Sequence, residues 1–398
     1  MKGHAVLRMP KTIHYGSRAF EEVGVEAALR GKRALIISDG VMNKLGNVSV
    51  LQKYLTNERL SHVVYLGVVS EPTDVYVAEA LALFRQEKCD VIISIGGGSC
   101  IDTAKAVSVL ATNGGYIGDY MGGNKLAETE PIAHIAIPTT AGTGSEATDA
   151  TVITNTVNDV KMMIKQPAFM PAVAMVDPLL SMSSPQHVTA ATGVDALSHA
   201  IEAYISKLAH PLTDMMALSA MKRITENIIP AFADGADIAA REAMALGSLQ
   251  AGIAFSNASV CLVHGMSRPI GALFHVPHGY SNAMLLPAVL DFSKETAIER
   301  LADLGNIFSR NEREMANEEA AGLAVSSVNE LCMKLEIPNL REWGIDRTEF
   351  ENAIGKMAKD AVASGSPANN PRVPAHEEIE ELYRVCYDYA YTSESKIK

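Results

Sequence analysis

The first 180 residues alternate short apolar runs with helical patterns, and this alternation constrains the fold more than any other feature. The apolar runs are rich in Val and Ile and occupy residues 34–38, 63–69, 91–95, 132–137 and 173–176. Continuous runs of this kind are typical of strands that are buried on both faces of a parallel sheet. Parallel strands need crossover connections, usually helices. The sequence therefore predicts an N-terminal α/β domain with a parallel sheet.

After about residue 180 the pattern changes to helices. Helical periodicity covers residues 185–206, 212–229, 236–254, 294–310, 314–336 and 375–391, while residues 363–371 are predicted to be an exposed loop. Prolines separate these segments, and we expect the boundaries of helices at Pro211, Pro230, Pro338 and Pro374. We predict two domains, residues 1–178 and an all-helical domain of residues 179–398, with a cleft between them.

The composition of the chain excludes some classes of binding partner. The formal net charge is −12, and no basic tract offsets it, so we expect neither nucleic acid nor an anionic membrane as a partner. No apolar stretch approaches the roughly 20 residues that span a bilayer. The N-terminal residues lack the apolar core of a signal peptide, and the five cysteines are scattered without a CxxC pair. These features predict a cytoplasmic protein with reduced thiols.

A glycine turn follows the apolar run at residues 91–95. The sequence Gly96-Gly-Gly-Ser stands between that predicted strand and a predicted helix. Glycines permit close backbone approach, and a helix N-terminus attracts anions such as a pyrophosphate. The turn matches neither the Gly-x-Gly-x-x-Gly fingerprint nor a P-loop. The alternative is a tight turn that needs glycine for its geometry only.

A loop rich in small hydroxyls, residues 138–148, follows the next predicted strand, and we call it the threonine loop. Such a loop can line a polar ligand at the carboxyl edge of a parallel sheet, or it can be a capped turn. Asp39 ends the first predicted strand. A carboxylate there can accept hydrogen bonds from an adenosine ribose and repel a 2′-phosphate, or it can be a helix N-cap.

Four residues suggest a metal site: Asp195, His199, His264 and His278. Asp195 and His199 are four residues apart in a predicted helix, so their side chains share one face. One carboxylate and three imidazoles suit a first-row divalent metal such as Fe(II), Zn(II) or Mn(II). By spacing alone, an ordinary surface pair or i,i+4 hydrogen bond is the more common explanation of Asp195 and His199.

Taken together, these motifs resemble the iron-dependent (group III) alcohol dehydrogenase family over essentially the whole chain. The resemblance is carried by Gly96-Gly-Gly-Ser with Asp102 and Lys105, by Pro138-Thr-Thr-x-Gly-Thr with Glu146, and by the four candidate ligands in the family's order. It implies a dehydroquinate synthase-like superfold, in which an NAD-binding α/β domain precedes a helical metal-binding domain, and a homodimer. Within this family, the chain is similar to lactaldehyde reductase-type members.

The resemblance also implies a role for each motif. The catalytic metal, usually Fe(II), would be bound by Asp195, His199, His264 and His278. The NAD-binding positions would be Asp39, Gly97, Gly98, Ser99, Asp102, Thr139, Thr140, Thr143, Thr148 and Lys161. The implied reaction is reversible hydride transfer between NAD and a small alcohol or aldehyde, with the metal acting as a Lewis acid.

Three positions depart from the family's pattern. Arg268 stands where relatives often have a histidine beside the substrate. Arginine does not carry protons near neutral pH, but it binds carboxylates, phosphonates or sulfonates bidentately. His275 replaces a common Asn or Asp, and it is a candidate proton relay, substrate contact or filler. Glu71 falls where relatives often place Asn or Asp near the adenosine.

The sequence leaves alternative functions open. One is a dehydrogenase for an anionic hydroxy compound, such as a hydroxy acid, phosphonate or sulfonate, held by Arg268; the alternative for Arg268 is a structural salt bridge. Another is an NAD-binding sensor without catalysis. Dehydroquinate synthase chemistry would need a basic cluster for a phosphorylated substrate, and the ligand set of one Asp and three His argues against it.

Overall fold

The computed structural model describes residues 4–310 and 314–391. The chain divides into two compact units. One unit covers Arg8–Ser184, and the other covers the described residues after Ser184 together with the few before Arg8.

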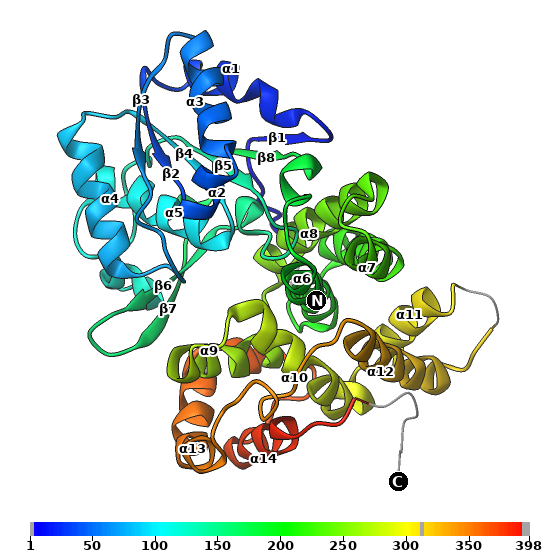
Figure 1. The fold of residues 1–398 in the computed structure, drawn as a ribbon. Helices are drawn as coiled ribbons and strands as arrows, with labels where there is room; N and C mark the ends of the chain where they lie inside the picture. The colour runs from blue at the N-terminus through cyan, green and yellow to red at the C-terminus, as the bar shows by residue number, and fades with distance from the viewer. Residues whose placement is uncertain (1–3, 311–313, 392–398) are drawn as a thin grey trace. The chain divides into compact units, whose positions relative to one another are not determined.

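The first unit is built around a parallel sheet of six strands, in the order β1-β8-β5-β4-β2-β3 (Figure 1). The strands are β1 (Thr12–Tyr15), β2 (Arg33–Ile37), β3 (Ser61–Tyr65), β4 (Val91–Gly96), β5 (His134–Pro138) and β8 (Val173–Val176). All five apolar runs that the sequence singled out contribute a strand. The predicted parallel sheet is therefore confirmed.

Helices cover both faces of this sheet. They are α1 (Val23–Ala28), α2 (Gly40–Lys44), α3 (Asn47–Asn57), α4 (Asp74–Gln86) and α5 (Gly98–Asn113). Successive residues of β2 alternate between the two cores: Leu35 packs with residues of α4 and α5, whereas Ile36 packs with residues of α1 and α3. Burial on both faces explains why the strands read as continuous apolar runs rather than alternating ones.

One strand feature differs from the expectation, and the position of β1 completes the description of the sheet. The strands β6 (Ala150–Asn155) and β7 (Val160–Lys165) form an antiparallel hairpin that the sequence did not predict. β1 lies at the edge of the sheet and pairs with β8 of the same chain, with Thr12 opposite Val173.

The second unit is all-helical, as predicted (Figure 1). Its helices are α6 (Gln186–Ile205), α7 (Pro211–Ala233), α8 (Ile238–Ala258), α9 (Leu262–Phe274), α10 (His278–Ser293), α11 (Ile298–Phe308), α12 (Asn317–Lys334), α13 (Arg347–Ala363) and α14 (His376–Tyr387). Short 3-10 turns occur in both units: η1 (Ala19–Glu22), η2 (Ile117–Gly123), η3 (Ser145–Ala147), η4 (Pro167–Phe169), η5 (Pro178–Ser181), η6 (Lys294–Thr296) and η7 (Ser366–Asn369).

Two expectations about the helical unit are wrong. The helix α7 does not end at Pro230 but continues to Ala233, and its last turn closes because Asp234 N–H donates to the Pro230 carbonyl. The segment 363–371 is not simply an exposed loop. Ser366 and Asn370 are buried, and a Cβ on Gly265 of α9 would approach Pro367 to 2.7 Å, so η7 packs directly on α9.

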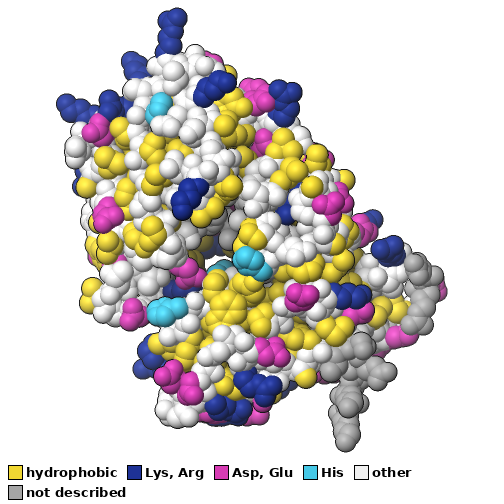
Figure 2. All heavy atoms as spheres, in the orientation of Figure 1, with side chains coloured by type: hydrophobic (Ala, Val, Ile, Leu, Met, Phe, Trp, Pro, Cys, Tyr) yellow, Lys and Arg dark blue, Asp and Glu magenta, His cyan; other side chains and the backbone are white. Residues whose placement is uncertain are grey.

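Among the described helices, none is by itself long and apolar enough to cross a membrane; α8 and α9 meet the criteria of length and composition only as a pair, bent by 102°. All five cysteines are free and buried. Acidic and basic side chains are interspersed on the face shown in Figure 2.

Candidate metal centre and cofactor cradle

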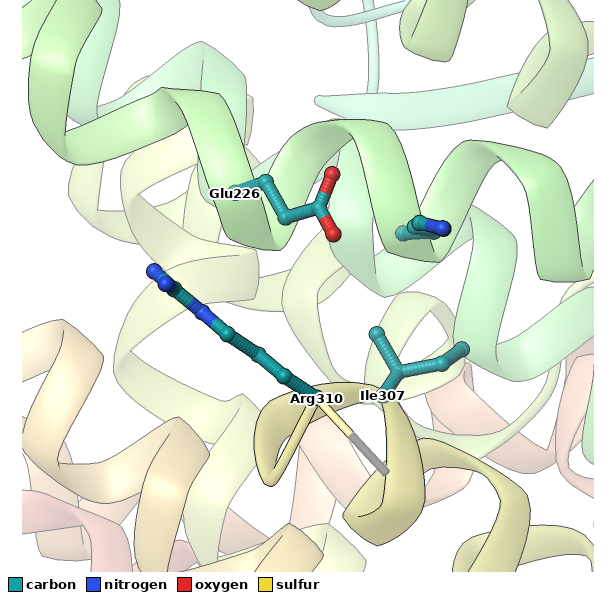
Figure 3. Close-up of a pocket in the computed structure, with 4 residues that line it drawn as sticks. Glu226, Ile307 and Arg310 are labelled. Atoms are coloured by element: carbon teal, nitrogen blue, oxygen red, sulfur yellow. The ribbon is translucent and has the colours of Figure 1, made fainter. Parts of the chain in front are cut away.

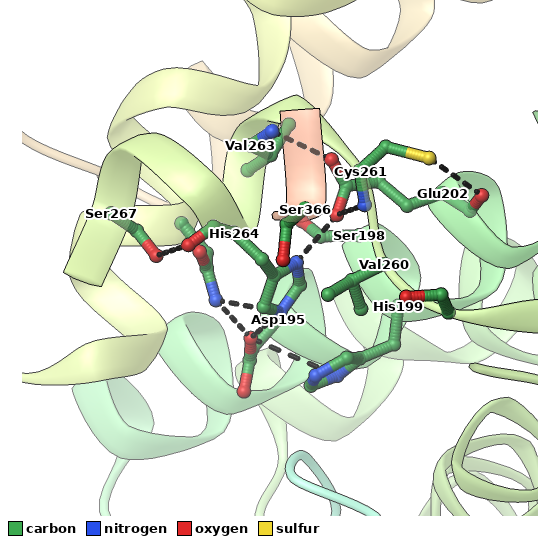
Figure 4. A network of polar contacts seen from close by, with 12 residues as sticks. Asp195, Ser198, His199, Glu202, Val260, Cys261, Val263, His264, Ser267 and Ser366 are labelled. Atoms are coloured by element: carbon green, nitrogen blue, oxygen red, sulfur yellow. Dashed lines mark hydrogen bonds and ion pairs between the residues drawn. The ribbon is translucent and has the colours of Figure 1, made fainter. Parts of the chain in front are cut away.

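Three helices of the second unit bring the four candidate ligands together. α6 carries Asp195 and His199 one turn apart, α9 carries His264 in its first turn, and α10 begins at His278. One ligand atom from each residue lies within 4.8 Å of the other three. Figure 4 shows Asp195, His199 and His264. The predicted convergence is therefore present in the structure.

The carboxylate of Asp195 lies at the centre of the cluster. Its Oδ1 is 3.8 Å from His199 Nδ1, 3.6 Å from His264 Nε2 and 4.0 Å from His278 Nε2. Burial alone would raise the pKa of Asp195, but the three imidazoles outweigh burial and lower it. The carboxyl group is thus held in the anionic form that a metal ligand requires.

This donor set fits a divalent first-row cation. Ligand atoms that surround one ion at about 2.0–2.2 Å are separated from one another by roughly 3–4 Å, and the Asp195 distances fall in that range. Three of the four side chains are almost completely buried, whereas His278 is 33% exposed. A site with one open side leaves room for a substrate atom beside the ligands.

Packing orients the imidazoles. The ring of His199 stacks on Phe255 of α8, with a centroid separation of 4.2 Å and an interplanar angle of 16°. Burial lowers the pKa of His264, but the hydrogen bond with Glu202 and the nearby carboxylate of Asp195 outweigh burial and raise it.

Two buried residues at the centre were missed by the sequence analysis. The Glu202 carboxylate lies 2.6 Å from His264 Nδ1, and Asn282 Nδ2 lies 2.6 Å from Asp195 Oδ1. Both have a helical spacing that was available in the sequence. Glu202 follows His199 by three residues, and Asn282 follows His278 by four, so each shares a helix face with a candidate ligand.

Arg268 lies one turn after His264 on α9. Its guanidinium is buried, its Nη1 donates a 2.9 Å hydrogen bond to Ser366 Oγ, and no described carboxylate lies within 4.0 Å of it. The structure therefore does not place Arg268 in a salt bridge with a described residue. Burial lowers the pKa of Arg268 to about 10, which leaves the side chain charged at neutral pH.

His275 has an exposed side chain and ends α9. Its backbone is left-handed, with φ 53° and ψ 29°. The described residues offer its ring no hydrogen bond or ion pair. Asn, Asp and His are enriched among non-glycine residues in this conformation, which gives a backbone reason for the residue type at this position.

In the first unit, the glycine turn and the threonine loop lie side by side. Gly96 at the end of β4 is opposite Pro138 at the end of β5. A Cβ on Gly98 would stand 2.8 Å from Thr143 Cγ2, so only glycine permits this approach. Gly98 begins α5, whose first N–H groups have no intrahelical partner. Gly97, Gly98, Ser99, Thr140 and Thr143 are all partly exposed there.

Other candidate cofactor residues make internal contacts. Asp102 accepts hydrogen bonds from Ser145 Oγ (2.5 Å) and Val152 N (2.9 Å). Thr148 is buried and accepts a 2.8 Å hydrogen bond from Lys105 Nζ, and Thr139 is also buried. These contacts hold the threonine loop and β6 against α5.

The adenosine-side candidates also have protein partners. Asp39 caps α2, since its Oδ1 accepts from Val41 N (2.7 Å) and Met42 N (2.8 Å). The N-cap alternative for Asp39 is therefore present in the structure, and its Oδ2 accepts a 3.6 Å hydrogen bond from Cys100 Sγ. Lys161 forms an ion pair with Glu71.

A cavity of about 290 Å³ lies elsewhere in the helical unit, between α7 and α11. It is lined by Lys222, Glu226, Ile307 and Arg310, three of which are labelled in Figure 3. None of the metal-centre residues lines it. Its mixed charges are typical of a solvated helix surface.

Comparison with known proteins agrees with this geometry. Residues 10–178 match the family "Iron-containing alcohol dehydrogenase", and residues 189–387 match "Fe-containing alcohol dehydrogenase family, C-terminal". The 1,3-propanediol dehydrogenase of Klebsiella pneumoniae is 38% identical over 384 residues, covering 95% of this chain and 98% of that protein. The NAD-dependent methanol dehydrogenase of Bacillus methanolicus is 38% identical over 378 residues, covering 94% and 98%.

A solved structure extends the likeness to the whole fold. The crystal structure of a 1,3-propanediol oxidoreductase superposes with a TM-score of 0.92 and 37% identity, covering 96% of this chain and 100% of that one. The chain therefore belongs to the iron-containing alcohol dehydrogenase family, and it is an NAD-dependent oxidoreductase of that family with a metal site of one aspartate and three histidines.

Proposed function

We propose that the protein interconverts a small alcohol and its aldehyde with NAD(H), using Fe(II), or Zn(II) or Mn(II), at the metal centre. The observation that carries this proposal is the convergence of four ligand atoms within 4.8 Å. A divalent cation bound there supplies a Lewis acid that polarises the oxygen of the substrate. The names of the relatives, a 1,3-propanediol dehydrogenase and a methanol dehydrogenase, support a small alcohol.

The ligands have separate tasks in this proposal. Asp195 supplies the only negative charge among the four, and burial keeps that charge from being screened by water. His199 and His264 hold the ion from inside the helical unit, and His278 stands on the open side, where the substrate oxygen enters. His275 is the candidate proton carrier at the surface, since its ring is exposed.

The first unit holds NAD in this proposal. The pyrophosphate is bound by the partly exposed Gly97, Gly98 and Ser99 at the N-terminus of α5, where the helix dipole favours an anion. Thr140 and Thr143 contact the cofactor directly. Asp102, Thr139 and Thr148 shape the loop that bears them, and Asp39 and Lys161 face the adenosine ribose.

An oxidation and reduction assay with a substrate panel tests the activity. The panel holds C2–C4 alcohols and aldehydes, lactaldehyde and acidic analogues, and turnover is followed by NADH absorbance. We expect turnover that is lost on chelation, and elemental analysis of protein purified without air identifies the metal. NAD binding without turnover of any member would favour the sensor instead.

The variant His264→Ala tests the centre itself. We expect it to lose turnover and most of its metal, because the variant lacks one of the four ligands and the imidazole that lies between Asp195 and Glu202. Turnover retained together with bound metal would refute the assignment of the site.

A second candidate function is oxidation of an anionic hydroxy compound. It is favoured by Arg268, a buried cation one turn from His264 that has no carboxylate within 4.0 Å among the described residues. Glu202 acts on Arg268 only at longer range, and a substrate carboxylate, phosphonate or sulfonate would supply a directly bound negative charge.

Two variants separate substrate binding from a structural role. Arg268→Ala should raise KM for anionic aldehydes at least tenfold more than for neutral ones. Ser366→Ala removes the hydroxyl that accepts a hydrogen bond from Arg268 and is the matched control, since it should affect both substrate classes equally. Equal losses on both classes in Arg268→Ala would eliminate the anionic candidate.

A further inference from the structure

Glu202 is a buried carboxylate next to the metal centre. It lies on α6, three residues after His199, with a relative exposure of 1%. No described Lys or Arg stands within 4.0 Å of its oxygens. Burial of an unpaired charge is costly, so hydrogen bonds must compensate it.

Three donors surround this carboxylate. Its oxygens accept hydrogen bonds from Cys261 N at 2.9 Å, Val263 N at 2.6 Å and His264 Nδ1 at 2.6 Å (Figure 4). Cys261 is the N-cap of α9, and its own side chain makes no capping bond. Glu202 therefore caps α9 from a different helix, and its charge is favourable at a helix N-terminus.

The same carboxylate selects the tautomer of His264. A carboxylate accepts hydrogen bonds only, so the proton of the neutral ring lies on Nδ1, which leaves the lone pair of Nε2 on the side of Asp195.

Asn282 supports this assignment from the opposite side of the ring. Its Nδ2 lies 2.6 Å from Asp195 Oδ1, an acceptor, which identifies the Nδ2 end of the amide as the donor. The same Nδ2 lies 3.0 Å from His264 Nε2 and 3.1 Å from His278 Nε2, and its two hydrogens serve two of these three neighbours. A donor beside Nε2 is compatible with the tautomer that Glu202 selects, which binds a cation through Nε2.

We propose that Glu202 is the positioning residue of the metal centre: it joins the start of α9 to the tautomer of His264 and so sets the affinity for the ion. The proposal rests on the metal site of the proposed function, but not on its substrate. Glu202 does not touch the ion itself.

Glu202→Gln is the sharpest test, because an amide keeps the size but cannot accept at both oxygens. If its NH₂ faces Cys261 N and His264 Nδ1, the ring must place its proton on Nε2. If its NH₂ faces Val263 N instead, that backbone donor is left opposite another donor. Either orientation disturbs the first turn of α9, which carries His264.

The readout is the affinity for Co(II) or Zn(II), measured by titration of the metal-free protein. We expect the dissociation constant to rise about 10–100-fold in Glu202→Gln. Glu226→Gln, the same substitution at an exposed position of α7, should change it less than about twofold. A lower Tm with unchanged metal affinity in Glu202→Gln would show a helix cap only and overturn the proposal.

A measurement on the wild type keeps the proposal falsifiable if the variant does not fold. In Zn(II)-loaded protein labelled with ¹⁵N-histidine, His264 should show a protonated Nδ1 and a metal-bound Nε2, assigned by its loss in His264→Asn. Zinc bound through Nδ1 would overturn the proposal. Failure of the wild type to bind any ion would instead reject the proposed function, so the two failures are distinguishable.

Discussion

Lys105 Nζ lies 2.8 Å from Thr148 Oγ1, so a buried ammonium on α5 holds the end of the threonine loop. The same nitrogen donates to Ser145 Oγ and to the carbonyl of Ala150. Burial lowers the pKa of Lys105, while Asp102 opposes that effect.

Replacement by an isosteric apolar chain should reveal what this cation contributes. In Lys105→Met three acceptors lose their donor and Asp102 loses its nearby cation, so we expect the free energy of unfolding to fall by about 3 kcal/mol. Urea denaturation measures it. Lys356→Met, which breaks an exposed pair with Asp360, should cost less than about 0.5 kcal/mol. A loss below about 1 kcal/mol in Lys105→Met would contradict the role of the buried ammonium.

Acid should destabilise the protein partly through His134. This residue is buried beside Ser94 Oγ, and burial together with Lys105 lowers its pKa to about 3. The unfolded chain takes up the proton near pH 6.5, whereas the folded chain does not, so stability is present above pH 6.5 and is lost as the pH falls toward 3.

The matched variant for this effect is His134→Asn, which does not titrate. Between pH 6.5 and 5 the wild type should lose about 2 kcal/mol more unfolding free energy than the variant. Denaturation curves at several pH values give both slopes, and all other titrating groups cancel in the difference. Parallel slopes for the two proteins would argue against a neutral buried His134.

The proposed ribose contact of Asp39 can be tested without loss of its helix cap. Asp39→Ser keeps an oxygen that can accept from Val41 and Met42 but removes the charge that repels a 2′-phosphate. We expect the ratio of kcat/KM for NAD to that for NADP to fall at least tenfold while Tm stays nearly constant. An unchanged ratio would leave Asp39 as a cap alone.

The left-handed backbone of His275 predicts an asymmetry between substitutions. Asn tolerates this conformation, so His275→Asn should change the unfolding free energy by less than about 0.5 kcal/mol. A β-branched residue does not, and His275→Val should cost about 1–2 kcal/mol. Thermal and urea denaturation compare the two, and equal stability would mean that the turn relaxes. Because Asn preserves the backbone, its kcat isolates any proton transfer by the ring.

The sequence predicted those parts of the fold that local pattern determines. Val- and Ile-rich runs predicted the parallel strands because both faces of each strand are buried. The sequence analysis did not predict the β6–β7 hairpin, because only alternate positions such as Met162 and Ile164 are buried and charged residues stand beside them. α7 passes through Pro230 because the loss of one N–H near its end is tolerated while the following turn closes.

The sequence likewise predicted some residues of the metal centre and missed others. Asp195 and His199 share a helix face, and the resemblance of the motif order to the family identified all four ligands. Glu202 and Asn282 were not predicted because their partners lie far away in the sequence. Glu202 contacts His264, 62 residues later, and Asn282 contacts Asp195, 87 residues earlier. Helical spacing points to such residues only once a ligand has been chosen as the reference.

The helix α6 carries Asp195, His199 and Glu202 within eight consecutive positions. Each residue of an α-helix turns by about 100°, so an inserted or deleted residue inside this stretch would swing one of the three to the wrong side. The spacing of Asp195, His199 and Glu202 is therefore a constraint on this part of α6 that is separate from the identity of the other side chains. A related protein with one residue inserted or deleted between these positions is therefore expected to have lost the metal site, even if it retains all three residue types.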